Sequence, residues 1–352
     1  MMLYPKHGTC FHGREFALYF CRILLQKLSL SENMASTTKD VASELETVLR
    51  VYRDGTVERL LGSPFVPPSP QDPTTGVSSK DIAISPKVSA RLYLPPLTAA
   101  ATLRKLPILV YFHGGGFCIE SPFSALCHRY ITNVVSRSNA LAVSVDYRLA
   151  PEHPLPAAYD DSWAALQWVA AHSGEGFQGQ DPWLISHGDF ERVYIGGDSA
   201  GANIAHNMAM RAATENLKMR IYGAFLCHPY FWGSKPLGSE SVPLHEKTLS
   251  YKTWTFVYPN SPGGIDNPMV NPLAGDAPNL SRLKCCRLLV CVAAMDELRE
   301  RGVGYHAAVK GSGWVGELEL CEVKGEGHGF HILSPESDNA EKMIKRLAAF
   351  LL

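Results

Sequence analysis

A serine between two glycines carries the strongest chemical signal in the sequence, within the run GDSAG at residues 197–201. A short apolar stretch, Val193–Gly196, precedes this run, and a stretch rich in small residues, Ala200–Ala213, follows it. We expect a strand, a sharp turn and a helix, in which the turn strains its central residue and the glycines prevent clashes. The turn would present the hydroxyl of Ser199 at a helix N-terminus, where a developing negative charge is stabilised. The pattern predicts a nucleophile; the alternative is a small-residue turn without a catalytic role.

Consecutive glycines at the end of another expected strand, Ile108–Phe112, offer hydrogen-bond donors for such a nucleophile. Acyl transfer develops negative charge on a carbonyl oxygen, and backbone N–H groups must already point at that oxygen. The residues that we assign to this oxyanion hole are His113, Gly114, Gly115, Gly116 and Ala200. We expect the donors to be the N–H groups of Gly115, Gly116 and Ala200. A phosphate-binding loop or a flexible turn is the alternative, but a phosphate-binding loop would carry a lysine and a serine or threonine after its glycines.

A serine nucleophile also needs a general base and a carboxylate that orients the base. Asp296 lies just past the expected strand Arg287–Ala294, and His328 lies just past Leu318–Val323, between glycines. Because the carboxyl ends of parallel strands meet at one edge of a sheet, both side chains should lie at the edge that holds Ser199. The sequence therefore predicts a catalytic triad of Ser199, Asp296 and His328.

Other acidic and imidazole side chains compete for the roles of orienting acid and base. Glu297 could replace Asp296, but it lies one residue farther from the strand. His331 could replace His328, but it lacks the same glycine setting. His206 falls inside an expected helix, and we interpret it as a structural residue.

Two further groups near the predicted site suggest a structural role. Asp146 and Arg148 follow the expected strand Leu141–Val145, and we expect them to form an ion pair that supports the nearby loops. Asp198 lies beside the predicted nucleophile, and we expect it to anchor a loop or a buried hydrogen bond.

Strands and helices alternate along most of the chain. The expected strands in this alternation are Ile108–Phe112, Leu141–Val145, Val193–Gly196, Ile221–Cys227, Arg287–Ala294 and Leu318–Val323. Between them, apolar residues recur at helical spacing. Such alternation predicts an α/β fold with a mostly parallel central sheet and helices on both faces.

The chain before this alternation shows weaker signals. Asp54 and Gly55 are typical of a tight turn, and they predict a short hairpin between Leu49–Tyr52 and Val57–Leu61. The apolar spacing of Ser43–Arg53 indicates a helical or a mixed structure.

Two segments fit the alternation poorly. Residues 229–283 are rich in aromatic residues and proline and have weak periodicity, and they are too long for an idle loop. We therefore predict that they form a cap over the carboxyl edge of the sheet. Residues 1–33 contain an apolar stretch interrupted by Arg22 and Lys27, and we expect this extension to lie outside the fold. An organelle-targeting segment is its alternative interpretation. Residues 34–352 should form a single domain.

Composition excludes several classes of partner. The formal net charge is −1 and no segment concentrates Lys or Arg, so nothing attracts the chain to nucleic acid or to an anionic membrane. With 46% hydrophobic and 19% charged residues, the chain has ample material for one large core. No segment has the length and apolarity of a spanning helix. We expect a soluble protein whose partner is a small molecule.

Cysteine usage indicates a reducing compartment. The nine cysteines are scattered and include no C-x-x-C pair, so the sequence predicts neither a disulfide framework nor a zinc site. We expect no metal and no organic cofactor, and a cytoplasmic location.

The chain resembles the plant carboxylesterases, within the hormone-sensitive-lipase-like branch of the α/β hydrolases. The resemblance covers about Ala35 to Leu352 and depends on His113–Phe117, Asp146–Pro156, Gly196–Asn203, Val290–Gly302 and Gly327–Phe330. It implies the α/β-hydrolase fold, and it matches the predicted triad and the three N–H donors to those of the family. The N-terminal segment of this family helps cover the pocket, which implies a second cap element near residues 37–61.

The resemblance implies a carboxylesterase that hydrolyses esters of small molecules through an acyl-enzyme, without a cofactor. Two other members of the family keep alternatives open. The 2-hydroxyisoflavanone dehydratases share these motifs, some with threonine at the nucleophile position, so Ser199 favours hydrolysis without excluding dehydration. Gibberellin receptors lack the catalytic histidine, so His328 argues against a pure hormone-binding protein. The substrate and the oligomeric state stay open.

Overall fold

The computed structural model describes residues 40–97, 104–174, 179–240 and 242–352. The chain divides after Leu61 into two compact units. The predicted extension, residues 1–33, and its boundary at residue 34 lie outside the described residues. The sequence reasoning placed residues 34–352 in a single domain and did not anticipate a division at Leu61.

The smaller unit contains a three-stranded antiparallel sheet, in the order β1-β2-β3. Its strands are β1 (Val41–Leu45), β2 (Leu49–Tyr52) and β3 (Val57–Arg59). Gly55 turns the chain between β2 and β3 with a φ of 83°, which glycine adopts without strain. The predicted hairpin is confirmed. The helical interpretation of Ser43–Arg53 is wrong, because β1 and β2 pair there.

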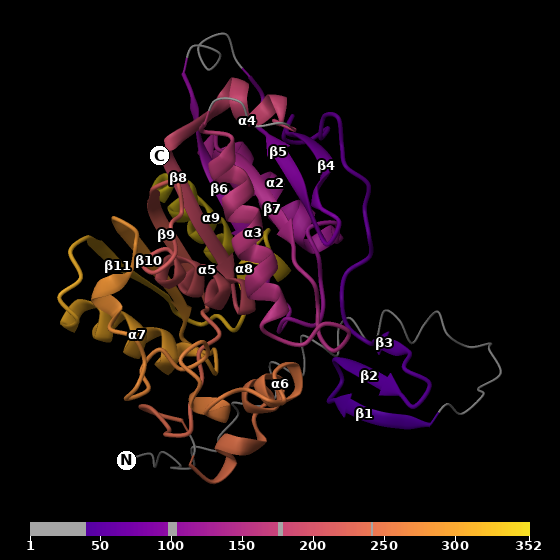
Figure 1. The fold of residues 1–352 in the computed structure, drawn as a ribbon, viewed down its shortest axis with the longest axis vertical. Helices are drawn as coiled ribbons and strands as arrows, with labels where there is room; N and C mark the ends of the chain where they lie inside the picture. Colours follow the sequence, from indigo (N-terminus) through magenta and orange to yellow (C-terminus); the bar gives the residue numbers. More distant parts are fainter. Residues whose placement is uncertain (1–39, 98–103, 175–178, 241) are drawn as a thin grey trace, which may run out of the picture. The chain divides into compact units, whose positions relative to one another are not determined.

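The larger unit contains an eight-stranded sheet, in the order β11-β10-β9-β8-β6-β7-β5-β4 (Figure 1). Its strands are β4 (Ser78–Ser85), β5 (Val88–Leu94), β6 (Leu106–Phe112), β7 (Leu141–Asp146), β8 (Gly188–Asp198), β9 (Ile221–Cys227), β10 (Arg287–Ala293) and β11 (Glu317–Val323). From β11 to β7 all neighbours pair in parallel, whereas β5 pairs antiparallel with β7 and with β4. The prediction of a mostly parallel sheet is confirmed.

Helices cover both faces of this sheet, as the sequence predicts. Its longer helices are α2 (Ala125–Ser138), α3 (Ala157–Ala171), α5 (Ala200–Arg211), α6 (Leu249–Val257), α7 (Arg299–Gly311) and α9 (Asp338–Phe350). Two shorter ones are α4 (Pro182–His187) and α8 (Phe330–Leu333). In Figure 1, α3 lies in front of the strands and α9 behind them. Within the described parts of the chain, no helix combines the length and the apolar character that crossing a membrane requires.

Burial on both faces explains why the central strands are continuous apolar runs. All residues of β6 are buried. Leu109 and Tyr111 belong to a core that also contains side chains of α2 and α9. Ile108 and Val110 point to the opposite face, because side chains alternate along a strand. The described cysteines, several of which lie in this core, are free thiols.

The segment that we predicted as a cap, residues 229–283, contains α6 and three short 3₁₀ turns. Its helix α6 lies against the loop that follows β6. The ring of Trp254 packs edge-on against Phe117, and a Cβ atom added to Gly116 would lie 3.2 Å from the Thr253 methyl carbon. The Tyr230 hydroxyl donates to the carbonyl of Ser250 at the start of α6. These contacts place α6 beside the glycine run.

Candidate active site

Ser199 occupies a strained turn between β8 and α5. Its backbone has φ of 51° and ψ of −116°, a conformation that L-residues rarely adopt outside functional sites. The N–H of Ser199 donates to the Cys227 carbonyl of β9 at 2.8 Å, which fixes the turn to the neighbouring strand. A Cβ on Gly201 would collide with the Phe112 carbonyl, and one on Gly197 with the backbone of Gly201. The close packing therefore requires both glycines, as the sequence indicated.

Asp296 and His328 meet at the same edge of the sheet. Asp296 follows β10, and its side chain is only 2% exposed, whereas the His328 side chain is 16% exposed. The Nδ1 of His328 lies 2.8 Å from Oδ2 of Asp296. The other carboxylate oxygen, Oδ1, accepts the N–H of Leu298 at 3.0 Å. The carboxylate therefore holds the imidazole in one orientation, as an orienting acid must.

A second histidine, His228, contacts the same carboxylate. Its Nδ1 lies 3.1 Å from Oδ2 of Asp296, and its ring is almost perpendicular to that of His328. The sequence reasoning missed this residue. The signal was present, because His228 directly follows β9 just as Asp296 and His328 follow β10 and β11.

The electrostatics of this cluster favour a charged carboxylate. Burial alone would raise the pKa of Asp296, but the charge of His328 and the hydrogen bonds from His228 and His328 hold it well below its usual range. Burial alone would lower the pKa of His328, but the carboxylate of Asp296 raises it above the ordinary value. The pair is therefore arranged to stabilise a positive imidazole beside a negative carboxylate.

The glycine run after β6 adopts backbone conformations that other residues avoid. Gly115 has φ of 105° and Gly116 has φ of 59°, and both are partly exposed. The Gly115 carbonyl accepts the N–H groups of Cys118 and Ile119, which fixes the loop. No described residue accepts a hydrogen bond from the N–H groups of Gly115 and Gly116. Ala200, at the start of α5, has no intrahelical acceptor for its N–H. Among the described residues no acceptor is recorded for these three N–H groups, which is the condition that binding an oxyanion requires.

The other two residues assigned to the oxyanion hole shape the loop instead. The N–H of Gly114 donates to Oδ1 of Asp198 at 3.0 Å, so it is not available to a substrate. The same oxygen of Asp198 accepts the Tyr111 hydroxyl. The ring of His113 stacks on Tyr147, with centroids 4.3 Å apart. Asp198 thus anchors the glycine loop to the turn that holds Ser199, which is the structural role that we expected for it.

Asp198 also connects Ser199 to the histidine cluster. Burial raises the pKa of the Asp198 carboxyl, while the hydrogen bond from Tyr111 and the charges of His328 and His228 act in the opposite direction. These interactions place the imidazoles within electrostatic range of the residue next to Ser199. In addition, the carbonyl that accepts the Ser199 N–H belongs to Cys227, the residue before His228.

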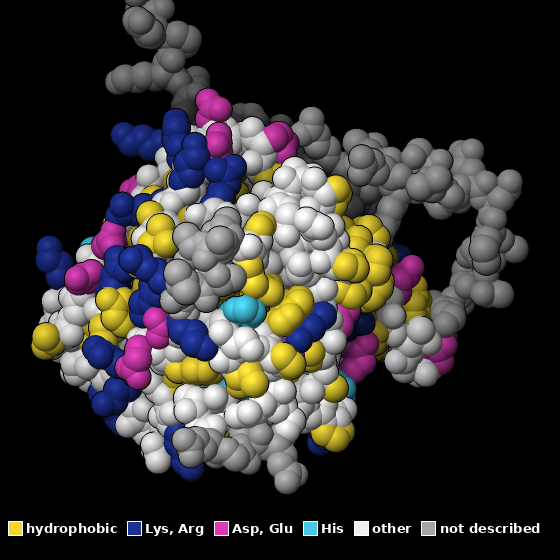
Figure 2. Space-filling view, turned by 90° about the horizontal axis from the view of Figure 1, so that it is seen from above, with side chains coloured by type: hydrophobic (Ala, Val, Ile, Leu, Met, Phe, Trp, Pro, Cys, Tyr) yellow, Lys and Arg dark blue, Asp and Glu magenta, His cyan; other side chains and the backbone are white. Residues whose placement is uncertain are grey.

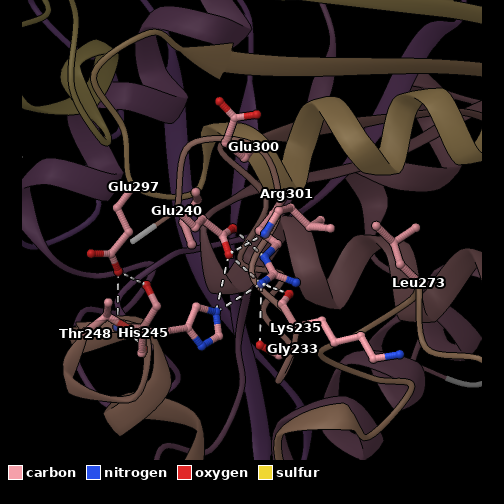
Figure 3. Close-up of polar contacts among 12 residues, drawn as sticks. Gly233, Lys235, Glu240, His245, Thr248, Leu273, Glu297, Glu300 and Arg301 are labelled. Atoms are coloured by element: carbon pink, nitrogen blue, oxygen red, sulfur yellow. Dashed lines mark hydrogen bonds and ion pairs between the residues drawn. The ribbon is translucent and has the colours of Figure 1, made fainter. Parts of the chain in front are cut away.

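The competing residues occupy other environments. Glu297 accepts hydrogen bonds from the N–H and hydroxyl of Ser250 and points toward the start of α6 (Figure 3). His331 is fully buried in α8, with its ring parallel to that of His228 at 5.1 Å. His206 lies inside α5 and contacts the Tyr305 hydroxyl at 3.0 Å, which agrees with a structural role. None of the three contacts Asp296 among the described hydrogen bonds.

The predicted ion pair of Asp146 and Arg148 is wrong. The guanidinium of Arg148 binds both carboxylate oxygens of Asp161 in α3, each at 2.8 Å. Asp146 instead accepts the hydroxyl of Ser89. Arg148 still supports the loops near the site, because it ties the chain after β7 to α3.

The same cluster is where a metal ion would bind if the site held one. Among the described residues, His228, Asp296 and His328 each offer one ligand atom, all within 4.8 Å of one another. However, the Nδ1 atoms lie 2.8 and 3.1 Å from the carboxylate oxygen, which are hydrogen-bond distances. The arrangement fits two imidazole protons shared with one carboxylate.

Comparisons with known proteins agree with this geometry. The family model described as the alpha/beta hydrolase fold matches residues 109–332. A 2-hydroxyisoflavanone dehydratase from Glycyrrhiza echinata is 57% identical over 328 residues, which cover 92% of this chain and 99% of the relative. Probable carboxylesterase 13 from Arabidopsis thaliana is 44% identical over 325 residues, or 89% of this chain and 98% of the relative. The solved structure of EstE1, a carboxylesterase cloned from a metagenomic library, has a TM-score of 0.61 at 26% identity, over 80% of this chain and 90% of its own.

Proposed function

Since the chain belongs to the α/β hydrolase family, in its plant carboxylesterase branch, we propose that it is a serine carboxylesterase acting on esters of small molecules. A fold hosts many activities, so the proposal depends on the site. The observation that carries it is the strained Ser199 at the end of β8, on the sheet edge that also holds the Asp296–His328 pair. Together these are the parts that acyl transfer requires.

The mechanism follows from the roles of these side chains. The Nε2 of His328, opposite the nitrogen bound to Asp296, takes the proton of the Ser199 hydroxyl as Oγ attacks the ester carbonyl. The resulting oxyanion is stabilised by the N–H groups of Gly115, Gly116 and Ala200. When the ester C–O bond breaks, His328 gives its proton to the leaving alcohol. Water, deprotonated by His328, then cleaves the acyl-enzyme and restores Ser199.

A dehydratase is the second candidate. The 57% identity to a 2-hydroxyisoflavanone dehydratase over nearly the whole chain favours it. In this alternative His328 removes a proton from a hydroxylated flavonoid, and the hydroxyl leaves as water. The glycine loop would then stabilise negative charge on a ketone oxygen. Ser199 distinguishes the two, because only acyl transfer needs a covalent bond to it.

Covalent labelling and turnover together test the proposal. A fluorophosphonate should label Ser199 alone, because only an activated hydroxyl reacts with it quickly. Ser199→Ala should lose both the label and the cleavage of nitrophenyl esters of graded chain length. Ser281→Ala, which removes an exposed serine, is the matched control and should retain both.

Two outcomes would contradict the esterase. A label that maps to another residue, or none at all, would remove Ser199 as nucleophile. Faster conversion of 2-hydroxyisoflavanone to its dehydrated product than of any ester, retained in Ser199→Ala, would assign the dehydratase instead.

A further inference from the structure

The carboxylate of Asp296 serves two imidazoles, and the proposed mechanism uses only one of them. We propose that His228 is a positioning residue, whose Nδ1–H donates to Oδ2 of Asp296 and holds this carboxylate in the orientation that His328 needs. The inference rests on the proposed function of the site. It adds a fourth side chain to the triad, supplied by the strand β9 that lies between the strands of Ser199 and Asp296.

The hydrogen-bond pattern assigns the proton of His228 to Nδ1. Its Nε2 is buried and has no hydrogen-bond partner among the described residues, so a proton there would be an unsatisfied buried donor. Nδ1 lies 3.1 Å from a carboxylate oxygen of Asp296, so a proton on Nδ1 has a hydrogen-bond acceptor. The N–H of Gly329 also points at Nδ1, but at 3.5 Å it lies at the limit of a hydrogen bond. The shorter contact decides the assignment, and Nδ1 of His228 is the donor to Asp296.

The backbone of His228 is built to hold this donor in place. Its φ is 50°, a left-handed conformation in which histidine and asparagine occur more often than most residues. Its N–H donates to the Cys291 carbonyl of β10 at 2.8 Å. The ring of His331 lies parallel to it on one side, 5.1 Å away. The donor is therefore fixed by the backbone and by ring packing together.

The charged and titratable groups around His228 come from every neighbouring element. They are Asp296 after β10, His328 after β11, His331 in α8 and Asp198 at the end of β8. Asp296 is the only one of these with a hydrogen bond to the His228 side chain among the described residues. A change at His228 should therefore act on the reaction through Asp296.

Removing the His228 donor should have two measurable consequences. The carboxylate would lose one of its fixed partners and turn more freely, which should lower kcat by about ten- to a hundredfold, as expected for a hydrogen bond to a charged group. The charge of Asp296 would no longer be shared with His228 and would act on His328 alone. The acid limb of the kcat/KM profile should then move to higher pH.

Two variants at this position separate the effect of losing the N–H donor from the effect of losing the imidazole ring. His228→Asn keeps an N–H donor near the place of Nδ1 and tolerates the left-handed backbone, so it should recover most of the activity. His228→Ala lacks the donor and should show both consequences. His331→Phe keeps a ring against His228 and is the matched control for disturbed packing. Thermal unfolding of each variant checks that it is folded.

A spectroscopic readout separates failure of this inference from failure of the proposed function. A proton in a short N–H···O hydrogen bond to a carboxylate gives a low-field NMR signal. We expect one such signal from His228 and one from His328. His228→Ala should lose one signal and keep the other, whether or not the protein cleaves esters. Slower fluorophosphonate labelling of Ser199 in the same variant would support the positioning role without a known substrate.

Three results would overturn the inference. His228→Ala could keep the wild-type kcat, labelling rate and pH profile. His228→Asn could be as slow as His228→Ala while both are as stable as the wild type. Alternatively, the low-field spectrum could be unchanged in His228→Ala, which would mean that His228 donates no proton to Asp296.

Discussion

Asp296 sets the charge of the site at the scale of single residues, and the pH dependence of turnover should report it. Its carboxylate raises the pKa of His328 above the ordinary value of about 6.5. Protonated His328 cannot accept the proton of Ser199, so kcat/KM for ester cleavage should fall in acid with a midpoint above about pH 6.5. His328→Ala should remove this limb and lower kcat by several orders of magnitude. A residual rate, on the order of a thousandfold above water, should persist because the oxyanion donors remain.

Ester cleavage measured across the acid and neutral range checks this expectation. A midpoint below the ordinary pKa of an imidazole would mean that Asp296 is not charged beside His328. Full activity in His328→Ala would assign the base to another residue, and the buried His331 would be the first to test.

The sequence predicts a site residue only where its local composition or its position after a strand is distinctive. Ser199 and the glycines sit in runs whose composition only a strained turn or a close approach explains. Asp296 and His328 could be predicted because they follow strands in the order that the triad requires. His228 also follows a strand, but a triad contains one histidine only, so the pattern did not predict a role for it. Its partner is defined by geometry alone.

At the scale of elements, apolar runs predict the buried strands well. They predict poorly where a strand begins if its first part contains charged residues. The expected Ile221–Cys227 coincides with β9, because both faces of this strand are buried. The expected Val193–Gly196 covers only part of β8, within its buried stretch. Before Val193, β8 contains Asp189, Glu191 and Arg192 and pairs with β6 across a register shift, so no continuous apolar run marks this part of the strand. Helix α4 has six residues, too few for helical periodicity to appear.

The attachment of the cap segment to α7 is a feature that composition could not reveal. The guanidinium of Arg301 in α7 makes two hydrogen bonds of 2.6 Å to the carboxylate of Glu240, and both side chains are almost completely buried (Figure 3). The same guanidinium contacts the His245 ring and the Lys235 carbonyl. Its carbon lies 5.0 Å from the ring centre of Trp232. The cap segment is thus fixed to the helix that begins just after Asp296.

Breaking this buried pair should destabilise the protein much more than breaking an exposed one. Arg301→Ala leaves the Glu240 carboxylate buried without its partner, which should lower the free energy of unfolding by about 3–5 kcal/mol. Lys345→Ala breaks the exposed pair with Glu341 in α9 and should cost about 1 kcal/mol or less. Urea unfolding of both variants measures the difference. Equal losses would show that the Arg301–Glu240 pair is not buried in solution.

At the scale of the whole molecule, the sheet brings the residues of the site together at one edge. Four neighbouring strands, β8 to β11, deliver Ser199, His228, Asp296 and His328 to one edge. On the face shown in Figure 2, basic side chains lie among acidic and apolar ones. Inside the larger unit, burial keeps several imidazoles neutral.

These buried imidazoles should make the fold sensitive to acid. Burial lowers the pKa of His113 to about 4 and that of His206 to about 3, and it lowers that of His331 well below the ordinary value. In the unfolded chain each titrates near about 6.5, so the unfolded state binds more protons between these values. Their contribution to stability is therefore complete above about pH 6.5 and is lost as the pH falls toward their folded pKa values. His328 acts in the opposite direction, because its raised pKa favours the folded state in acid. Burial also lowers the pKa of His128, His172 and His306, which adds to the effect of the three buried imidazoles.

The expected result is a steep fall in the free energy of unfolding between neutral and mildly acid pH. Each imidazole that stays neutral in the folded state contributes about 1.4 kcal/mol per pH unit, so the total loss from about pH 6.5 to 5 should reach several kcal/mol. Urea unfolding at intermediate pH values measures this slope. His206→Phe places another ring between Phe231 and Tyr305. It should reduce the slope by the contribution of one proton, about 1.4 kcal/mol per pH unit. Stability that is constant or rises on acidification would mean that these imidazoles are protonated in the folded protein, and that the core around them admits water.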